Sequence, residues 1–413
     1  MSNSSSIWLA ESRQPIINAV LAALDELTLS KKPGLLTLWG GRGVGKTLLL
    51  NSIEERIKTS KPHIATQRWD LKQHTLEDVR ARVSNCINAA SADRPQAVLL
   101  DNFDLLLRND PDGSDFFDIE RDVILPSVEN GSCFFIITSQ IELTQWREDE
   151  VRQHQLSFQI PSLVRQEMNT LIQESGLREP KSAFELTYGH PKAVEWLSAE
   201  PTLSKETISA KAFEYFLEGL SPDSRELAGQ VCPMPLFNPF LLRLISHEGD
   251  VISGILYLKH LDQIREMIGV GLVYWDISFG AYRFRDNAVR RLLARGMRLR
   301  DPLIFQHVNK TANQYYQTEV RSASYLHRHL VSAVYHRAIA IQEQGNNDAG
   351  ENCLSWVCEN LANWIGAQWS DVLEMWVSGD NDFAFAEEMK DLIGPEVFGK
   401  ISDCLQTAQQ SNP

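Results

Sequence analysis

The chain has 413 residues, 43% of them hydrophobic, and this length predicts two to four domains with enough apolar side chains for several cores. Its formal net charge of −14 makes the whole chain a poor candidate for a general polyanion binder. The six scattered cysteines form no CxxC spacing, and no segment approaches about 18 uninterrupted apolar residues. With a polar N-terminus that lacks a signal-peptide pattern, these features predict a cytoplasmic protein with no membrane partner.

Helices and strands are expected to alternate through the first 160 residues. Hydrophobic periodicity and an apparent capping box at Thr75 predict helices at 14–28, from Lys46 onward, at 75–90 and at 116–128. Short apolar runs predict strands at 35–39, 64–69, 97–101, 134–138 and 156–160. Alternation of this kind is typical of an α/β fold, a parallel sheet with helices on both faces.

A glycine-rich stretch, G-G-R-G-V-G-K-T at residues 40–47, follows the first expected strand. It has the full GxxxxGK[ST] spacing of a P-loop, set between a strand and a helix. Glycines let backbone N–H groups converge on phosphates and tolerate positive φ, and the helix N-terminus adds its dipole. Lys46 is expected to reach the β/γ-phosphates of ATP or ADP, and Thr47 to hold Mg²⁺. The predicted nucleotide-binding residues here are Gly40, Gly41, Arg42, Gly43, Val44, Gly45, Lys46, Thr47 and Leu48.

Polar residues end the next two apolar strands, and they form the predicted catalytic set. Asp101 ends the strand at 97–101, where a P-loop NTPase needs a carboxylate for Mg²⁺. Asp104 is the better candidate to position or activate the attacking water, because Asn102 cannot take a proton; a helix N-cap is its alternative role. Gln140 lies two residues after Thr138, at the polar tip of the next strand. This tip is suited to sense the γ-phosphate; the alternative is an ordinary strand end.

The remainder of the chain is expected to be mostly helical. Residues 205–300 predict a winged helix: four helices, then strands at 272–275 and 282–284 around a Phe279-Gly280 turn. The C-terminal helices show no clean repeat, so a tetratricopeptide-like array stays an open alternative. The predicted domains are an N-terminal helical segment at 1–30, a P-loop ATPase core at 31–162, a helical lid at 163–204, the winged helix at 205–300 and a helical domain at 301–413.

Together with Gly189-His190-Pro191 in the lid, these motifs resemble those of the STAND ATPases, signal-transduction ATPases that include the NB-ARC proteins. The resemblance covers roughly residues 7–300. It implies that Pro191 packs on the adenine. In that family a Met/Phe-His-Asp element at the end of the winged-helix domain often contacts the β-phosphate of bound ADP. The matching stretch here is Phe284-Arg285-Asp286, so the resemblance gives Arg285 this contact.

Three positions depart from the family pattern. Gln140 stands where the family usually has an arginine that reads the γ-phosphate, which predicts slow hydrolysis; Arg42 could substitute for it or simply face solvent. Arg285 replaces a histidine and could hold ADP more strongly, because it is charged at all physiological pH. Arg13 only echoes the glycine-arginine start of many members, and it is carried as a nucleotide-binding candidate.

The winged helix also admits a DNA-binding interpretation, because arginines cluster in its last helix and can bind a phosphate backbone. A solvated face, or a contact with the acidic remainder of the chain, is the alternative. The clustered residues are Arg290, Arg291, Arg295, Arg298 and Arg300.

The sequence therefore predicts a slow regulatory ATP hydrolase with ATP/ADP and Mg²⁺ as cofactors. The main hypothesis is a STAND-type switch in which ADP holds the core and winged helix together and ATP favours an open, assembling state. Its partner would be a separate effector or sensor protein, with self-assembly controlled by nucleotide. The alternative is an AAA-like DNA-binding ATPase or transcriptional regulator.

Overall fold

The computed structural model describes residues 13–30, 34–90, 95–109, 113–130, 133–168, 180–246, 253–321, 323–346, 348–364, 367–377 and 383–411. The chain divides into two units, which are described one at a time. The first comprises Met1–Leu203 with Gly269–Gly271, and the second comprises Ser204–Ile268 with Leu272–Pro413.

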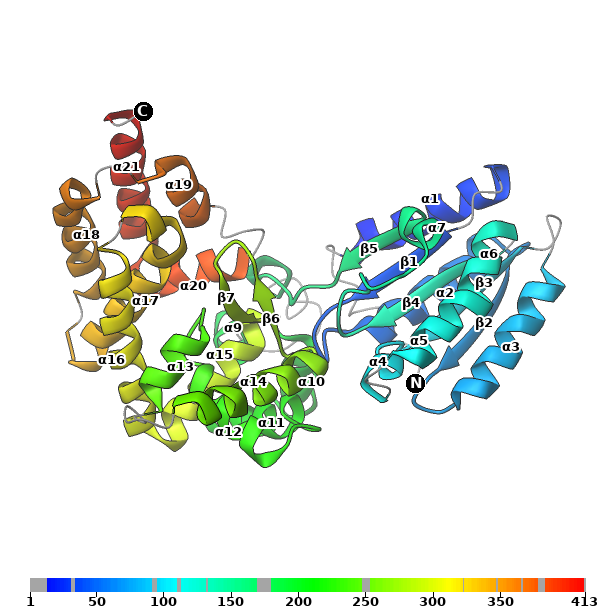
Figure 1. Ribbon diagram of the computed structural model, residues 1–413, viewed down its shortest axis with the longest axis horizontal. Helices are drawn as coiled ribbons and strands as arrows, with labels where there is room; N and C mark the ends of the chain where they lie inside the picture. The colour runs from blue at the N-terminus through cyan, green and yellow to red at the C-terminus, as the bar shows by residue number, and fades with distance from the viewer. Residues whose placement is uncertain are drawn as a thin grey trace. The chain divides into compact units, whose positions relative to one another are not determined.

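A parallel sheet forms the centre of the first unit (Figure 1). Its strands lie in the order β2-β3-β4-β1-β5, and every neighbouring pair is parallel. Because β4 lies between β3 and β1, the carboxyl ends of these three strands meet at one edge of the sheet. The strands are β1 (Gly34–Trp39), β2 (Ala65–Asp70), β3 (Gln96–Asp101), β4 (Cys133–Ser139) and β5 (Gln155–Gln159).

Alternate side chains of the central strands enter two cores, one on each face of the sheet. On β3, Leu99 packs into the core beneath α1 (Gln14–Ser30) and α2 (Lys46–Ser60). Its neighbour Leu100 packs into the opposite core, with α3 (Leu76–Ala89) and α5 (Ser114–Ile119). The predicted fold class of this region, a parallel sheet with helices on both faces, is confirmed. Two short helices, α4 (Leu105–Asn109) and α7 (Asp149–Gln153), were not expected.

The helix expected at 116–128 is not regular. It runs as α5, a π-helical segment η2 (Glu120–Ile124) and α6 (Leu125–Asn130). Pro126 lies two residues after the π segment and has no N–H for a regular helical bond. The wider turn accommodates its ring. Beyond the sheet, the expected helical region at 165–200 contains α9 (Pro180–Thr187) and α10 (Pro191–Ala199). Residues 169–179 lie outside the described residues.

The second unit begins with helices and a small antiparallel hairpin. Ser204, Ser221 and Asn238 cap the first three helices, each accepting a backbone N–H three residues on. Strands β6 and β7 pair from Val273↔Phe284 to Asp276↔Ala281, and Phe237 forms a further bridge with Tyr282. The elements are α11 (Lys205–Phe216), α12 (Pro222–Val231), α13 (Pro239–Ile245), α14 (Ser253–Gly269), β6 (Val273–Asp276), β7 (Ala281–Phe284) and α15 (Asn287–Arg300).

The rest of the second unit is helical, as expected. Helix α17 packs against α16, α18 and α19, with Val334 and Ala338 buried and the ring of Tyr316 stacked on that of His336. Among the described residues, no helix combines the length and the apolar character needed to cross a membrane. The elements are α16 (Pro302–Glu319), η3 (Ala323–Tyr325), α17 (Leu326–Glu343), α18 (Ala349–Asn360), η4 (Leu361–Asn363), α19 (Trp369–Val377), α20 (Phe383–Ile393) and α21 (Pro395–Ser411).

Candidate nucleotide-binding site

The predicted P-loop leaves the carboxyl end of β1 and leads directly into α2. Gly43 and Gly45 have φ of 80° and 96°, values that favour glycine. Gly40 is required for a different reason, since an added Cβ would lie 2.5 Å from the carbonyl oxygen of Ile160. The loop therefore needs glycine at positions 40, 43 and 45.

Lys46 opens α2 and turns back over the loop. Its side chain is buried, and Nζ donates to the carbonyl oxygens of Gly40 and Gly41, both at 2.8 Å. Thr47 and Leu48 are exposed in the first turn of the helix, and Arg42 is half-buried. Val44 packs in the core beneath α2, so it anchors the loop to the sheet. The amino end of a helix and a buried ammonium group together suit an anion.

Asp101, at the end of β3, is 1% exposed and bonded through both oxygens. Its Oδ1 accepts the hydroxyl of Thr138 from β4, and its Oδ2 lies 3.0 Å from a guanidinium nitrogen of Arg68 on β2. Asn102 follows with φ of 60°, and its backbone N donates to Thr138 Oγ1 at 3.0 Å. The Asn102 amide donates to Asp70 Oδ1 at 2.8 Å. The structure thus joins the tips of three neighbouring strands around Asp101.

Asp104 and Gln140 also meet, through a carboxylate and a backbone amide. Asp104 is 1% exposed, and its Oδ1 accepts the backbone N–H of Gln140 at 3.0 Å. Phe103 N donates to the Thr138 carbonyl at 2.9 Å, so with the Asn102 bond to Thr138 Oγ1 the turn after β3 makes three hydrogen bonds to the tip of β4. The three predicted catalytic residues, Asp101, Asp104 and Gln140, therefore lie in one polar cluster at the carboxyl edge of the sheet.

Sequence reasoning missed two residues of this cluster, Arg68 and Asp70. They are two apart on β2, so they share one face of the strand, while Trp69 between them is buried in the core on the other face. The signal that could have found them is a pair of opposite charges at i and i+2 near the carboxyl end of a strand.

The oxygen donors present fit Mg²⁺. Asp101 and Thr47 offer a carboxylate and a hydroxyl, the hard ligands that this ion prefers, and nucleotide phosphates and water normally complete its coordination. Within the described part of the chain no three His, Cys, Asp or Glu side chains gather as a metal site of their own. Thr47 and Asp101 are the residues that would hold a magnesium ion on the protein side.

The lid motif has a local structural explanation. Gly189 has φ of 77°, and a Cβ there would lie 2.0 Å from the Leu163 carbonyl oxygen. His190 caps α10 by accepting the backbone N–H of Lys192, and Pro191 occupies the first turn of that helix. Arg13 donates to the Pro161 carbonyl and so holds the segment that follows β5. Contacts of Pro191 and Arg13 with a nucleotide stay predictions.

Arg285 lies just after β7 in the second unit. Its guanidinium carbon is 5.2 Å from the centroid of the Tyr274 ring, and its backbone N donates to the Leu272 carbonyl. Asp286, the last residue of the stretch Phe284-Arg285-Asp286, caps α15 by accepting the backbone N–H groups of Ala288 and Val289. The expected contact of Arg285 with a β-phosphate stays a prediction.

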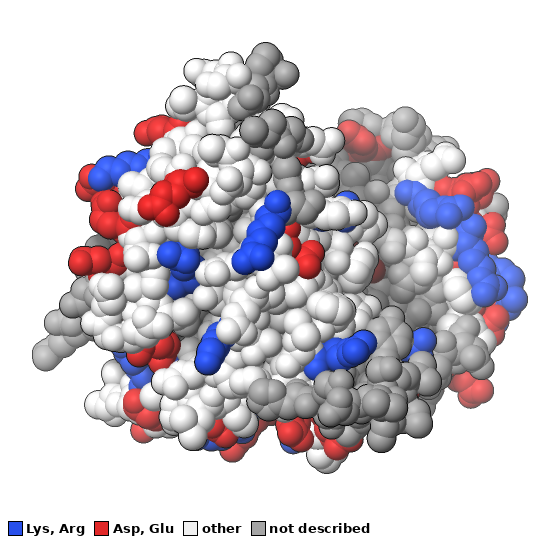
Figure 2. Space-filling view, turned by 60° about the vertical axis from the view of Figure 1, so that its left-hand side comes forward, with Lys and Arg blue, Asp and Glu red and all other residues white. Residues whose placement is uncertain are grey.

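Charged side chains do not gather into a basic patch on the face shown in Figure 2, as far as the described residues go. Lys and Arg lie there mostly singly, with Asp and Glu among them. Three arginines of α15 contact other side chains of the second unit. Arg298 pairs with Glu343 at 2.6 Å, Arg295 donates to Ser209, and the Arg300 guanidinium lies 4.8 Å from the centroid of the Phe213 ring.

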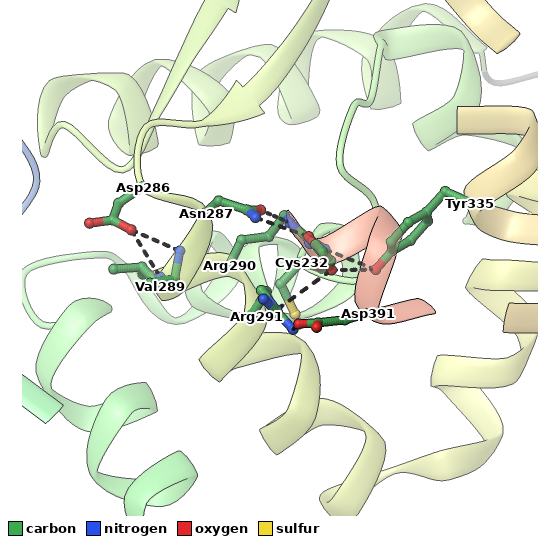
Figure 3. Close-up of polar contacts among 10 residues, drawn as sticks. Cys232, Asp286, Asn287, Val289, Arg290, Arg291, Tyr335 and Asp391 are labelled. Carbon is green, nitrogen blue, oxygen red and sulfur yellow. Dashed lines mark hydrogen bonds and ion pairs between the residues drawn. The ribbon is translucent and has the colours of Figure 1, made fainter. Parts of the chain in front are cut away.

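Arg290 and Arg291 contradict the expectation of a DNA-binding helix face. Arg290 is 1% exposed and donates to Glu388 of α20, to Asn287 and to the Cys232 carbonyl (Figure 3). Arg291 pairs with Asp391, which also lies on α20, at 3.3 Å. The alternative interpretation, a contact with acidic residues elsewhere in the chain, is the correct one for these two residues.

Comparison with known families decides the class of the core. Residues 36–140 match the model described as AAA, the ATPase family associated with various cellular activities. This region has the fold of a P-loop NTPase core and is similar to the AAA ATPases. The matched residues span the P-loop, Asp101, Asp104 and Gln140. The comparisons support nucleotide binding by an AAA-type ATPase and do not single out the STAND subtype. No curated protein sequence matches the chain.

Several solved structures are similar to this chain at low identity. The Aeropyrum pernix ORC2 protein, solved as ADPNP-ADP complexes, is 16% identical with a TM-score of 0.32, over 69% of this chain and 94% of that one. The Aeropyrum pernix ORC1 protein in complex with DNA is 13% identical with a TM-score of 0.37, over 73% and 97%. Domain III of the Thermotoga maritima replication initiation protein DnaA is 13% identical with a TM-score of 0.34, over 48% and 91%.

Proposed function

We propose that this protein is a regulatory ATPase that binds ATP or ADP with Mg²⁺ at the P-loop and hydrolyses ATP slowly. The observation that carries the proposal is the cluster at the carboxyl edge of the sheet. Buried Lys46 opens α2 after the loop that follows β1, and Asp101, which has a partner at each carboxylate oxygen, ends β3. Bound Mg²⁺ would supply charge neutralisation at the β- and γ-phosphates.

The residues of the chain divide the work between binding and reaction. Lys46 offers its charge to the phosphates, for which it exchanges the carbonyls of Gly40 and Gly41. Thr138 orients Asp101 by donating to one of its oxygens. Asp104 is the carboxylate that would accept a proton from water, but one of its oxygens already accepts the backbone N–H of Gln140. Gln140 carries no positive charge, so it stabilises the transition state less than an arginine would.

The Asp104–Gln140 bond also supports a regulatory role. A γ-phosphate near the tip of β4 would compete with Asp104 for the backbone N–H of Gln140. The geometry of the turn that carries Asp104 would then depend on which nucleotide is bound. In this proposal Pro191 packs on the adenine and Arg285 contacts a diphosphate. Arg13 holds the start of the lid segment through the Pro161 carbonyl. Each nucleotide state would then favour a different conformation or assembly.

Exchange of Asp104 for asparagine tests the assignment. We expect the wild-type protein to release phosphate from ATP at below about one per second, only with Mg²⁺. Asp104→Asn keeps the size and loses the base, so its rate should fall about 10²-fold or more while ATP stays bound. The measurements are phosphate release and retention of labelled ATP. Asp149→Asn, on an exposed carboxylate of α7, is the control. No phosphate release by the wild type would contradict the hydrolase, and an unchanged Asp104→Asn rate would contradict this residue's role.

A DNA-acting ATPase is the second candidate function, ahead of the signalling switch. The element order α12, the Phe237 bridge, α13, α14 and the β6–β7 hairpin is compatible with the winged helix that we propose for this region, and this favours the candidate. Fluorescence anisotropy with a duplex at two salt concentrations, with and without ATP, tests it: salt-dependent binding would support the candidate. Nucleotide-dependent size in light scattering without any DNA binding would instead favour the switch.

A further inference from the structure

Arg68 lies between the P-loop helix and the strand that carries Asp101. One of its terminal nitrogens, Nη1, donates to Asn51 Oδ1 and lies 3.7 Å from Glu54 Oε2, both on α2. The other, Nη2, donates to Asp101 Oδ2 at 3.0 Å. Asn51 is four residues after Thr47, so the two share one face of α2. The guanidinium group therefore links the helix that presents Thr47 to the carboxylate at the end of β3.

The burial of Asp101 explains why a cation is needed there. An ionised carboxylate that is 1% exposed loses most of its hydration, and only charged or hydrogen-bonding partners replace it. Thr138 supplies one hydrogen bond, which is neutral, and Arg68 supplies the charge. Arg68 itself is 24% exposed, so the pair lies at the border between the core and solvent.

We propose that Arg68 is the resident counter-cation of Asp101, and that it sets how much Mg²⁺ the nucleotide site requires. Its charge offsets that of the carboxylate, which lowers the attraction that Asp101 by itself offers a divalent cation. A cation beside Asp101 also repels Mg²⁺ directly. The ion consequently enters with the negative phosphates of a nucleotide. Arg68 acts on nucleotide chemistry through Asp101 and is thus a positioning residue.

The proposal rests on the proposed nucleotide binding, and the experiment keeps the two apart. Binding of fluorescent ADP is titrated with Mg²⁺ in full-length wild type, Arg68→Gln and Arg68→Lys. Glutamine keeps a hydrogen-bond donor without the charge, and lysine keeps the charge. Arg56→Gln makes the same change of charge at an exposed position of α2 and is the control. Thermal unfolding with Mg²⁺ alone is the second measurement.

We expect Arg68→Gln to reach half-saturation at roughly tenfold lower Mg²⁺ than wild type, from the loss of a charge a few ångströms from the ion. It should also melt at a lower temperature without Mg²⁺ and gain more from Mg²⁺ alone, because Asp101 has lost its counter-charge. Arg68→Lys and Arg56→Gln should behave like wild type. An Arg68→Gln titration that matches wild type, or needs more Mg²⁺, would overturn the proposal.

A second variant covers the case in which Arg68→Gln does not fold. Glu54→Gln removes a carboxylate that competes for Arg68, so Arg68 should hold Asp101 more firmly and the Mg²⁺ requirement should rise about twofold. A fall in the requirement would count against the proposal. If wild type binds no ADP at any Mg²⁺ concentration, the nucleotide-binding function itself fails.

Discussion

Replacing Lys46 with alanine is expected to abolish measurable binding of both ATP and ADP. The lysine side chain is 8% exposed, and its ammonium group already lies over the loop, 2.8 Å from two carbonyl oxygens. Alanine removes the one side-chain charge that the motif directs at the phosphates. Hydrogen bonds between charged partners are the strong ones, so an affinity loss of about 10²-fold or more is expected. Isothermal titration calorimetry with MgATP and MgADP measures it.

Lys58→Ala provides the matched control for this prediction. Lys58 lies on the same helix, its side chain is 58% exposed, and its partner Glu54 is four residues away. The change in charge is identical, so a shared loss of affinity would reflect general electrostatics. Affinity unchanged in Lys46→Ala, with a normal melting temperature, would mean that the nucleotide does not use this loop.

Replacing Glu388 with alanine is expected to destabilise the second unit by about 3–5 kcal/mol, the usual cost of leaving a buried charge without its partner. Glu388 accepts from Arg290, Asn287 and Tyr335, and it joins α20 to α15 and α17 (Figure 3). Burial, the largest single influence, would raise the pKa of Glu388, but the charges of Arg290 and Arg291 together with the hydrogen bonds from Arg290 and Asn287 outweigh it and leave this pKa below its usual value. The carboxylate is therefore ionised beside Arg290 at neutral pH. Urea denaturation of the full chain measures the loss.

Asp391→Ala is the control for the buried pair, because the Arg291–Asp391 contact is partly exposed and should contribute less than about 1 kcal/mol. Arg290→Met combined with Glu388→Leu should recover much of the stability that either truncation loses, since apolar residues often replace a buried pair at little cost. Equal, small effects of Glu388→Ala and Asp391→Ala would show that the buried pair is not the stronger link.

The ion pairs of Arg290 and Arg291 determine which variants can test DNA binding. Removal of Arg290 and Arg291 would weaken DNA binding by damaging the fold, whether or not α15 touches DNA. Alanine at Arg265 is more informative, since its side chain is 76% exposed on α14 and pairs only locally with Asp262. A role in DNA binding would appear there as a smaller salt dependence of the affinity.

Local sequence rules determined much of the ATPase core. The P-loop, the strand that ends in Asp101 and the helix cap at Thr75 all depend on neighbours within a few residues, and the structure has them where expected. The alternation of strands and helices was sufficient to predict a covered parallel sheet. The motifs do not separate the STAND subtype from other P-loop ATPases, because Gly189-His190-Pro191 also has a purely local explanation in a tight turn and a helix start.

Tertiary structure alone decided which polar residues meet. Arg68 and Asp70 reach Asp101 and Asn102 because β2 pairs with β3, with Asp70 opposite Asp101, and no local pattern reveals that register. Arg290 looked like a surface cation because its helix is rich in arginine. Its partner Glu388 is 98 residues away, and only the packing of α20 against α15 brings the two together. Periodicity shows which face of an element is apolar, whereas pairing of charges depends on which elements become neighbours in the fold.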